Sequence, residues 1–223
     1  MRLSRKKPSR SRIGYLRGDS YGGSARLYRT RLLRGPDMTK VGIIVGTTRP
    51  NRNGEAVAQW VHDLAAKRGD AEYELVDLKD YGLPHLDEPN APAMGNYQHD
   101  HTKRWSEKIA SFDAFVFVTP EYNHSIPGAL KDAIDFLYAE WSNKAAGFVG
   151  YGVDGAVRAV EHLRHILAMV SVATVQAQVT LSVHTDFENF TAFKPVPAQE
   201  ERLSLVLDQV LAWGGALRPL RVA

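Results

Sequence analysis

From residue 41 onward, short apolar runs alternate with segments in which apolar residues recur every three or four positions. The two periods are typical of buried strands and of helices that bury one face. The apolar runs predict five strands, at residues 41–45, 72–78, 114–118, 145–150 and 173–183. The helical spacing predicts five helices, over residues 57–65, 105–112, 128–138, 157–170 and 203–217.

Strict alternation of strands and helices predicts a doubly wound parallel sheet with helices on both faces. The first, third and fourth strands are almost continuously apolar, which is expected where both faces are covered. The fifth strand alternates apolar and polar residues, and Glu72, Glu74 and Asp77 interrupt the second. These two strands are therefore expected at the edges, which gives the flavodoxin-like order 2-1-3-4-5 rather than 3-2-1-4-5-6. In this order the loops after strands one and three flank the switch point, where ligands bind.

The loop after the first strand carries polar side chains suited to an anion. Thr47 supplies a hydroxyl, and Arg49 and Arg52 supply guanidinium groups able to make bidentate contacts to phosphate oxygens. Asn53 stands where a helix N-cap is expected, and Gly54 follows it. The free N–H groups and the dipole of a helix start favour an anion. The sequence therefore predicts a phosphate site, with an ordinary polar turn bearing solvated arginines as the alternative.

Two familiar nucleotide motifs are absent from this loop. Thr48 and Asn51 occupy the second and third glycine positions of G-x-G-x-x-G, counted from Gly46. Asn51 also replaces the second glycine of the P-loop motif, and Arg52 stands where its lysine belongs. The loop is thus not predicted to bind a nucleoside triphosphate or a dinucleotide pyrophosphate.

Two further loops are expected at the same edge of the sheet. The loop after the third strand reads Pro120-Glu121-Tyr122-Asn123, and its Tyr ring and backbone N–H groups suit a planar heterocycle. The loop after the fourth strand contains Gly152, and glycine permits close backbone approach to a ligand. The alternatives are a turn whose tyrosine packs on the surface and a plain strand-to-helix turn.

Residues 46–54, 120–132 and 150–164 together resemble the NAD(P)H-dependent FMN reductase family, which includes quinone, azo-dye and chromate reductases. The resemblance runs from about residue 41 to the last helix and departs from the family at Thr47, where many members have serine. It implies a flavodoxin-like fold and a tightly held FMN. The FMN phosphate is then expected on Thr47, Arg49, Arg52, Asn53 and Gly54, and its ring against Pro120, Glu121, Tyr122 and Asn123, with Gly152 close by.

The resemblance implies an enzyme that passes hydride from NADPH or NADH through FMN to a small acceptor, such as a quinone, free flavin, an azo or nitro compound, or a metal oxyanion. A flavodoxin-type electron carrier that does not oxidise NAD(P)H is the alternative. The flavin carries the chemistry, so no protein catalytic residue is expected. The His pairs His99/His101 and His162/His165 lack companion ligands in a recognisable motif, so no metal is expected either.

Charge divides the chain at residue 38. Residues 1–37 hold 11 basic and 2 acidic residues, a net charge of +9, and the remaining 17 basic and 23 acidic residues leave −6. We expect a basic, disordered extension at 1–37, or translation starting at Met38, and one FMN-binding domain at 38–223. A transit peptide or a nucleic-acid arm ranks lower. No cysteine and no apolar run of spanning length occur, so a cytoplasmic protein without a membrane or nucleic-acid partner is expected. A homodimer or homotetramer is expected, with Trp105, Trp141 and Tyr138 as interface or core residues, the core being preferred for Trp105.

Overall fold

The computed structural model describes residues 38–221, and the expectations for residues 1–37 lie outside this part of the chain. Five parallel strands form one sheet in the order β2-β1-β3-β4-β5, as the hydrophobic pattern predicts. The strands are β1 (Lys40–Val45), β2 (Glu72–Asp77), β3 (Ala114–Pro120), β4 (Ala145–Gly152) and β5 (Ala173–Ser182). The register pairs Val45 of β1 with Val118 of β3, so both strands end at one edge of the sheet.

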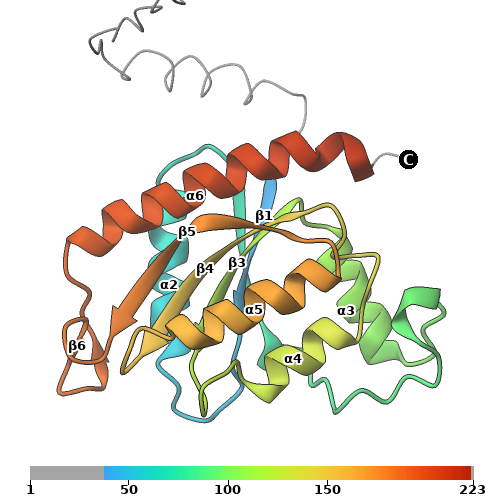
Figure 1. Cartoon of the computed structure of the whole chain (residues 1–223), viewed down its shortest axis with the longest axis horizontal. Coiled ribbons are helices and arrows are strands. Elements are labelled where there is room, and N and C mark those ends of the chain that lie inside the picture. Colours follow the sequence, from blue (N-terminus) through green and yellow to red (C-terminus); the bar gives the residue numbers. More distant parts are fainter. Residues whose placement is uncertain (1–37, 222–223) are drawn as a thin grey trace, which may run out of the picture. The chain divides into compact units, whose positions relative to one another are not determined.

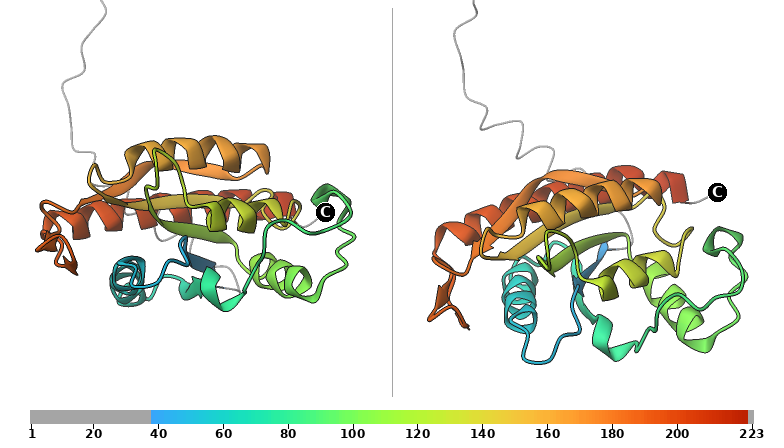
Figure 2. Two further views of the ribbon diagram at one scale, coloured as in Figure 1. Left: turned by 90° about the horizontal axis from the view of Figure 1, so that it is seen from below. Right: turned by 60° about the horizontal axis from the view of Figure 1, so that its bottom comes forward.

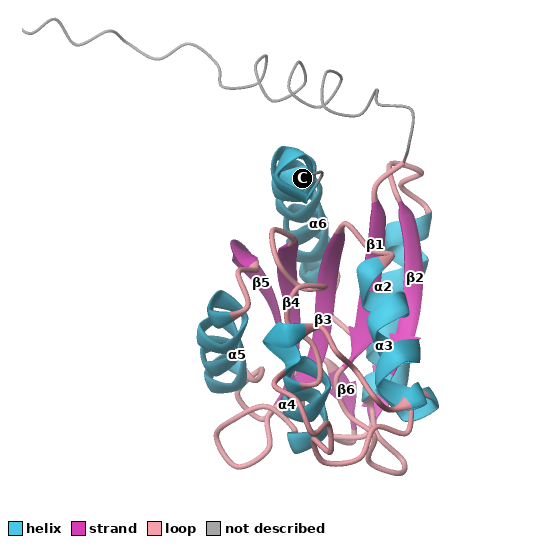
Figure 3. Ribbon diagram, turned by 90° about the vertical axis from the view of Figure 1, so that its right-hand side faces the viewer, coloured by secondary structure: helices cyan, strands magenta, loops and turns pink. Residues whose placement is uncertain are grey.

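Helices cover both faces of the sheet (Figure 2). One apolar core joins the sheet to α2 (Gly54–Ala66) and α6 (Ala198–Leu217). The other joins it to α3 (Asp100–Ala110), α4 (Gly128–Asp135) and α5 (Val157–Met169). Figure 3 shows the helices packed along the strands, with the long connections gathered at one end. None of the helices within residues 38–221 combines the length and the apolar character that crossing a bilayer requires.

The segment between β2 and α3 contains two short 3-10 helices, Leu78–Asp80 and Pro92–Met94. A small antiparallel hairpin, β6 (Phe187–Glu188) with β7 (Ala192–Phe193), follows β5, and the apolar pattern gave no sign of it. A last 3-10 helix, Arg218–Arg221, continues α6.

Two buried tryptophans shape the end of α4. Trp105 donates its indole N–H to the carbonyl of Ala133 at 2.7 Å, and Trp141 donates to that of Ile134 at 3.2 Å. Helix α4 therefore ends at Asp135, three residues earlier than predicted. Both tryptophans are fully buried in the core of this subunit. The preference for a core position is confirmed for Trp105, and of the two positions left open for Trp141 the structure shows the core.

Candidate functional site

Three loops meet at the carboxyl edge of the sheet, after β1, β3 and β4, and the first two lie side by side at the lower edge in Figure 1. The N–H of Gly46 donates to the carbonyl of Val118 at 2.8 Å, which fixes the start of the first loop to β3. Thr47 is buried, and its Oγ1 lies 2.9 Å from the hydroxyl of Tyr122. This contact between Thr47 and Tyr122, both predicted to bind FMN, holds the first and second loops together.

Helix α2 begins at Gly54, with Asn53 at the N-cap position as predicted, but the Asn53 side chain makes no capping hydrogen bond. The first backbone bond of this turn runs from the N–H of Val57 to the carbonyl of Asn53 at 3.1 Å. Among the described residues, the N–H groups of Gly54, Glu55 and Ala56 have no backbone or capping partner. An anion beside this turn would satisfy these donors and gain from the helix dipole.

Arg52 is buried rather than solvated. Its guanidinium forms ion pairs with Asp77 at the end of β2 and with Glu55 at 2.8 Å, and its side chain is 2% exposed. Its Nε has no hydrogen-bond partner among the described residues, although it is fully buried. Arg49, by contrast, is exposed. The two arginines therefore differ: Arg52 is anchored by carboxylates and keeps a buried Nε without a partner, whereas Arg49 is exposed at the surface.

A second orphaned donor comes from Tyr151, near the end of β4. Its hydroxyl is buried and has no partner in residues 38–221. Burial raises the pKa of Tyr151, which keeps the hydroxyl neutral and able to donate. A Cβ at Gly54 would lie 2.7 Å from this oxygen, so the close approach of α2 to β4 requires glycine there. An unsatisfied buried polar group is costly, so a donor of this kind calls for a partner.

Arg52 and Tyr151 both line one small cavity of about 90 Å³, which is the scale of a phosphate group rather than of a whole flavin nucleotide. Its lining comes from all three loops: Arg49, Asn51, Arg52, Asn53, Pro120, Tyr122 and Tyr151. A larger hollow of about 510 Å³ lies against α3, but it is lined by Asp80, Tyr81, Arg104, Glu107, Lys108 and Ser111. None of the predicted site residues lines it, so we assign the site by the convergence of donors and not by volume.

The second loop closes in a tight turn. Tyr122 and Ser125 exchange backbone hydrogen bonds of 2.9 and 3.2 Å, and Asn123 and His124 between them have φ of 48° and 75°. Two positive φ values are characteristic of the type I′ turn. The N–H of Tyr122 is consumed inside this turn, so it is not free for a ligand as the sequence suggested. The Asn123 N–H has no backbone partner among the described residues and remains available.

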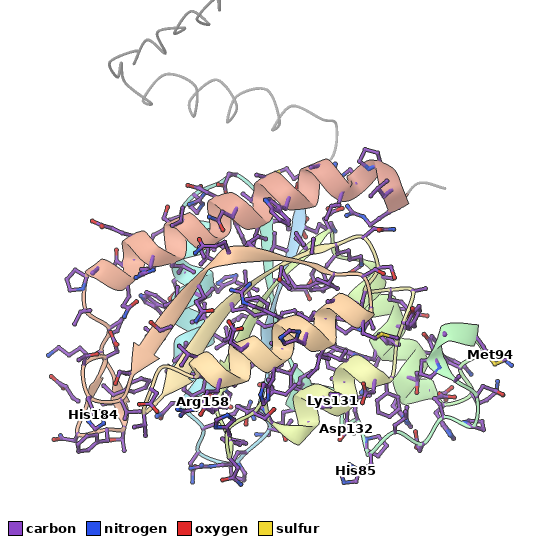
Figure 4. The ribbon with its side chains drawn as sticks, in the orientation of Figure 1. His85, Met94, Lys131, Asp132, Arg158 and His184 are labelled. Carbon is purple, nitrogen blue, oxygen red and sulfur yellow. The ribbon has the colours of Figure 1, made fainter. Side chains whose placement is uncertain are left out.

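Glu121 turns its carboxylate away from the cavity. It accepts from Arg158 Nε at 2.5 Å and from the Ala159 N–H at 3.4 Å, and its side chain is 10% exposed. Arg158, at the start of α5 (Figure 4), also donates to Asp154 at 2.7 Å. This carboxylate therefore links the second loop to α5, and only the backbone of Glu121 remains for a ligand.

The structure brings most of the predicted residues together. Five of them line the cavity, and Thr47 and Gly54 contact its walls through Tyr122 and Tyr151. Gly152 does not line it, and its carbonyl accepts the N–H of Val183 at 2.9 Å. Asn51 and Tyr151 also line the cavity, although neither was among the predicted site residues. Tyr151 directly follows the predicted fourth strand, at the start of the loop that contains Gly152, so its place at this edge of the sheet could be predicted but its unpartnered hydroxyl could not.

Fold and site together define a flavodoxin-like protein with a phosphate-sized cavity at the switch point. Residues 39–186 match the sequence model of a family described as NADPH-dependent FMN reductase, and the chain belongs to this family. It is an FMN-dependent NAD(P)H oxidoreductase, as the resemblance implied, and FMN and NAD(P)H are its cofactors.

Curated relatives agree with this assignment, and a solved structure shares the fold. An NAD(P)H-dependent FMN reductase of Schizosaccharomyces pombe is 38% identical over 149 residues, which cover 66% of this chain and 74% of the relative. A 2-hydroxy-1,4-benzoquinone reductase of Burkholderia is 26% identical over 186 residues, 78% of this chain and 95% of the relative. The fold is similar to that of FerB, a flavoenzyme NAD(P)H:(acceptor) oxidoreductase from Paracoccus denitrificans, with a TM-score of 0.62 and 24% identity over 79% of this chain and 97% of FerB.

Proposed function

We propose that the cavity holds the phosphate of FMN. The observation that carries this proposal is a pair of buried donors, Arg52 Nε and Tyr151 OH, that have no partner among residues 38–221 and belong to two residues lining one cavity. The unpartnered N–H groups at the start of α2 and the exposed charge of Arg49 add to them. The donor set fits a dianionic phosphate, and none of the residues that line the cavity carries a carboxylate.

We further propose that the flavin ring lies against the second loop. Pro120 and Tyr122 supply a wall, and Tyr122 is held in place by Thr47. The free N–H of Asn123 and the backbone of Glu121 face the polar edge of the ring, while Gly152 leaves room beside it. Bound FMN supplies hydride chemistry, and the protein binds and orients it.

The acceptor is proposed to be a quinone. The Burkholderia relative is named as a reductase of a hydroxybenzoquinone. A planar quinone and a nicotinamide both suit an open ring platform, which one fills after the other leaves. The second loop is an exposed turn at Asn123 and His124, so the platform is accessible from solvent.

The experiment that tests this function is anaerobic reduction followed by reoxidation. Protein loaded with FMN is expected to bleach on addition of NADPH or NADH and to regain its colour when a benzoquinone is added. Colour that persists with both nicotinamides would contradict the hydride step. Bleached protein that benzoquinone leaves colourless, but that free FMN or an azo compound reoxidises, would contradict the quinone assignment alone.

We also make proposals on the location of the enzyme, the part of the chain that binds FMN and the oligomeric state. NAD(P)H belongs to the cell interior, so we assign the protein to the cytoplasm, which fractionation of cells would test. We also propose that residues 38–223 suffice for FMN binding and that the protein is a homodimer or homotetramer. Flavin titration of a chain starting at Met38 tests the first point, and sedimentation of the full chain tests the second.

A further inference from the structure

Helix α5 contacts the second loop at two points. At the start of the loop, Nε of Arg158 donates to the carboxylate of Glu121 at 2.5 Å. At the end of the loop, Nδ1 of His162 lies 2.9 Å from Oγ of Ser125, which is a hydrogen-bond distance. Residues four apart on a helix share one face, so both contacts come from the same face of α5. The helix therefore holds the loop on both sides of Asn123.

The turn between these two contacts has a backbone shape that needs support. Asn123 and His124 both have positive φ, at 48° and 75°. Glycine is the usual residue at the second central position of a type I′ turn, because a Cβ there carries a conformational cost. A residue in such a conformation persists where the surrounding structure holds it. His124 has a large side chain at this position, so we expect neighbouring contacts to keep the turn in shape.

His162 supplies such contacts at the end of the turn. Besides its hydrogen bond to Ser125, its ring lies 5.8 Å from the ring of His124, centre to centre, which is within the range of aromatic pairs. His162 thus reaches two of the four residues of the turn. Both histidines are exposed, so core packing does not account for their pairing. Among the described residues no third ligand completes a metal site around the two rings.

We propose that His162 is a positioning residue for the flavin ring. It holds the turn in the shape that leaves the N–H of Asn123 free, since the N–H groups of Tyr122 and Ser125 are used within the turn. This inference rests on the proposed placement of the ring against the second loop, and it adds the residue that keeps this loop in its binding shape. His162 acts through Ser125 and His124 rather than by direct contact with the flavin.

His162→Phe keeps an aromatic ring on α5 and removes the hydrogen bond to Ser125. A protein whose turn has the right shape for only part of the time binds its ligand less tightly in proportion to that fraction. Loss of one neutral hydrogen bond corresponds to a factor of roughly 2 to 12, so the Kd of FMN should rise by about this factor. Riboflavin has the same ring, so its Kd should rise equally. Equal weakening distinguishes this effect from a defect in the phosphate cavity, which weakens FMN alone.

Flavin fluorescence titration of the full chain measures both constants. His162→Asn offers an amide in place of Nδ1 and should keep both flavin affinities close to those of the wild type. His165→Phe is the matched control, because His165 is also exposed on α5 and has no hydrogen-bond partner within residues 38–221. It should leave both affinities unchanged. These positions are exposed, so the Tm of each variant without flavin should shift by less than about 2 °C.

A double variant tests the backbone strain directly. His124→Gly removes the Cβ from the left-handed position, so the turn should keep its shape without support from α5. Adding His124→Gly to His162→Phe should therefore restore both flavin affinities, a non-additive result expected of coupled residues. A double variant that binds as weakly as His162→Phe would overturn the proposal, as would a His162→Phe protein that binds both flavins as tightly as the wild type. A wild-type chain that binds neither flavin would overturn the proposed flavin site as well, so the two failures are distinguishable.

Discussion

Replacing Tyr151 with phenylalanine tests the proposed phosphate contact without changing the rest of the flavin site. The change removes one hydroxyl from a buried position and leaves the ring of the side chain in place. Tyr151 lines the cavity, and its hydroxyl has no partner within residues 38–221. Two effects of opposite sign are expected: weaker FMN binding and a more stable protein without FMN.

The magnitudes follow from the chemistry of the lost hydroxyl. A hydrogen bond to a charged group is worth about 1.5–3 kcal/mol, so FMN affinity should fall roughly 10- to 150-fold. Riboflavin has no phosphate, and its affinity should stay within about twofold. An unsatisfied buried hydroxyl costs about 1–3 kcal/mol, so the FMN-free variant should gain about 1 kcal/mol or more. For a domain of this size that raises Tm by about 2–4 °C.

Flavin fluorescence titration with FMN and with riboflavin measures the first effect, and thermal unfolding without flavin measures the second. Tyr73→Phe is a matched control, because the Tyr73 hydroxyl is already satisfied by Asp70 at 2.8 Å. This variant should lose stability and keep its FMN affinity. Equal weakening of FMN and riboflavin by Tyr151→Phe, or no weakening of either, would refute the placement of the phosphate.

Three further predictions concern the scaffold around the site. Gly147→Ala places a Cβ 2.5 Å from Val206 and 2.7 Å from Val210, so it should cost about 1–3 kcal/mol in urea unfolding, and a cost below 0.5 kcal/mol would contradict the packing of α6 on β4. Glu121→Gln breaks the ion pair with Arg158 and should lower stability by about 1 kcal/mol with FMN affinity within about threefold, whereas a tenfold loss of affinity would mean that the carboxylate reaches the flavin. Burial lowers the pKa of Lys144 to about 7, so above that pH the unfolded chain binds more protons than the folded one. The free energy of unfolding should therefore rise by about 1 kcal/mol per pH unit from pH 7 to 9. Lys144→Met should abolish this rise.

Lys144 also illustrates a competition that the direction of its pKa shift resolves. Its Nζ donates to the carbonyl of Ile109 at 2.7 Å and lies 5.4 Å from the centre of the Phe115 ring, and both contacts favour the charged form. Burial opposes them and is the larger effect. The positive charge of Arg221 acts in the same direction as burial, so the pKa of Lys144 lies below its ordinary value and stability rises with pH.

The sequence by itself determined the fold of this protein. Continuous apolar runs at β1, β3 and β4, against alternation at β5 and charges in β2, were enough to order the strands, because burial on one or two faces leaves a periodic signature in the chain. The strand order then placed the first two loops at the switch point. Their residue types predicted an anion beside a planar ring, and the family match confirmed the flavin reductase.

Only the tertiary structure decided which polar groups are free. Arg52 and Arg49 looked alike in the sequence, yet Arg52 is buried against Asp77, 25 positions away. The carboxylate of Glu121 pairs with Arg158, and Trp141, for which core and interface were both open, is in the core. Periodicity reports local burial, whereas an ion pair or a hydrogen bond depends on distances of 3–4 Å between distant segments. That dependence explains why the sequence could place Tyr151 just after the fourth strand but could not show that its hydroxyl is an unsatisfied donor in the fold.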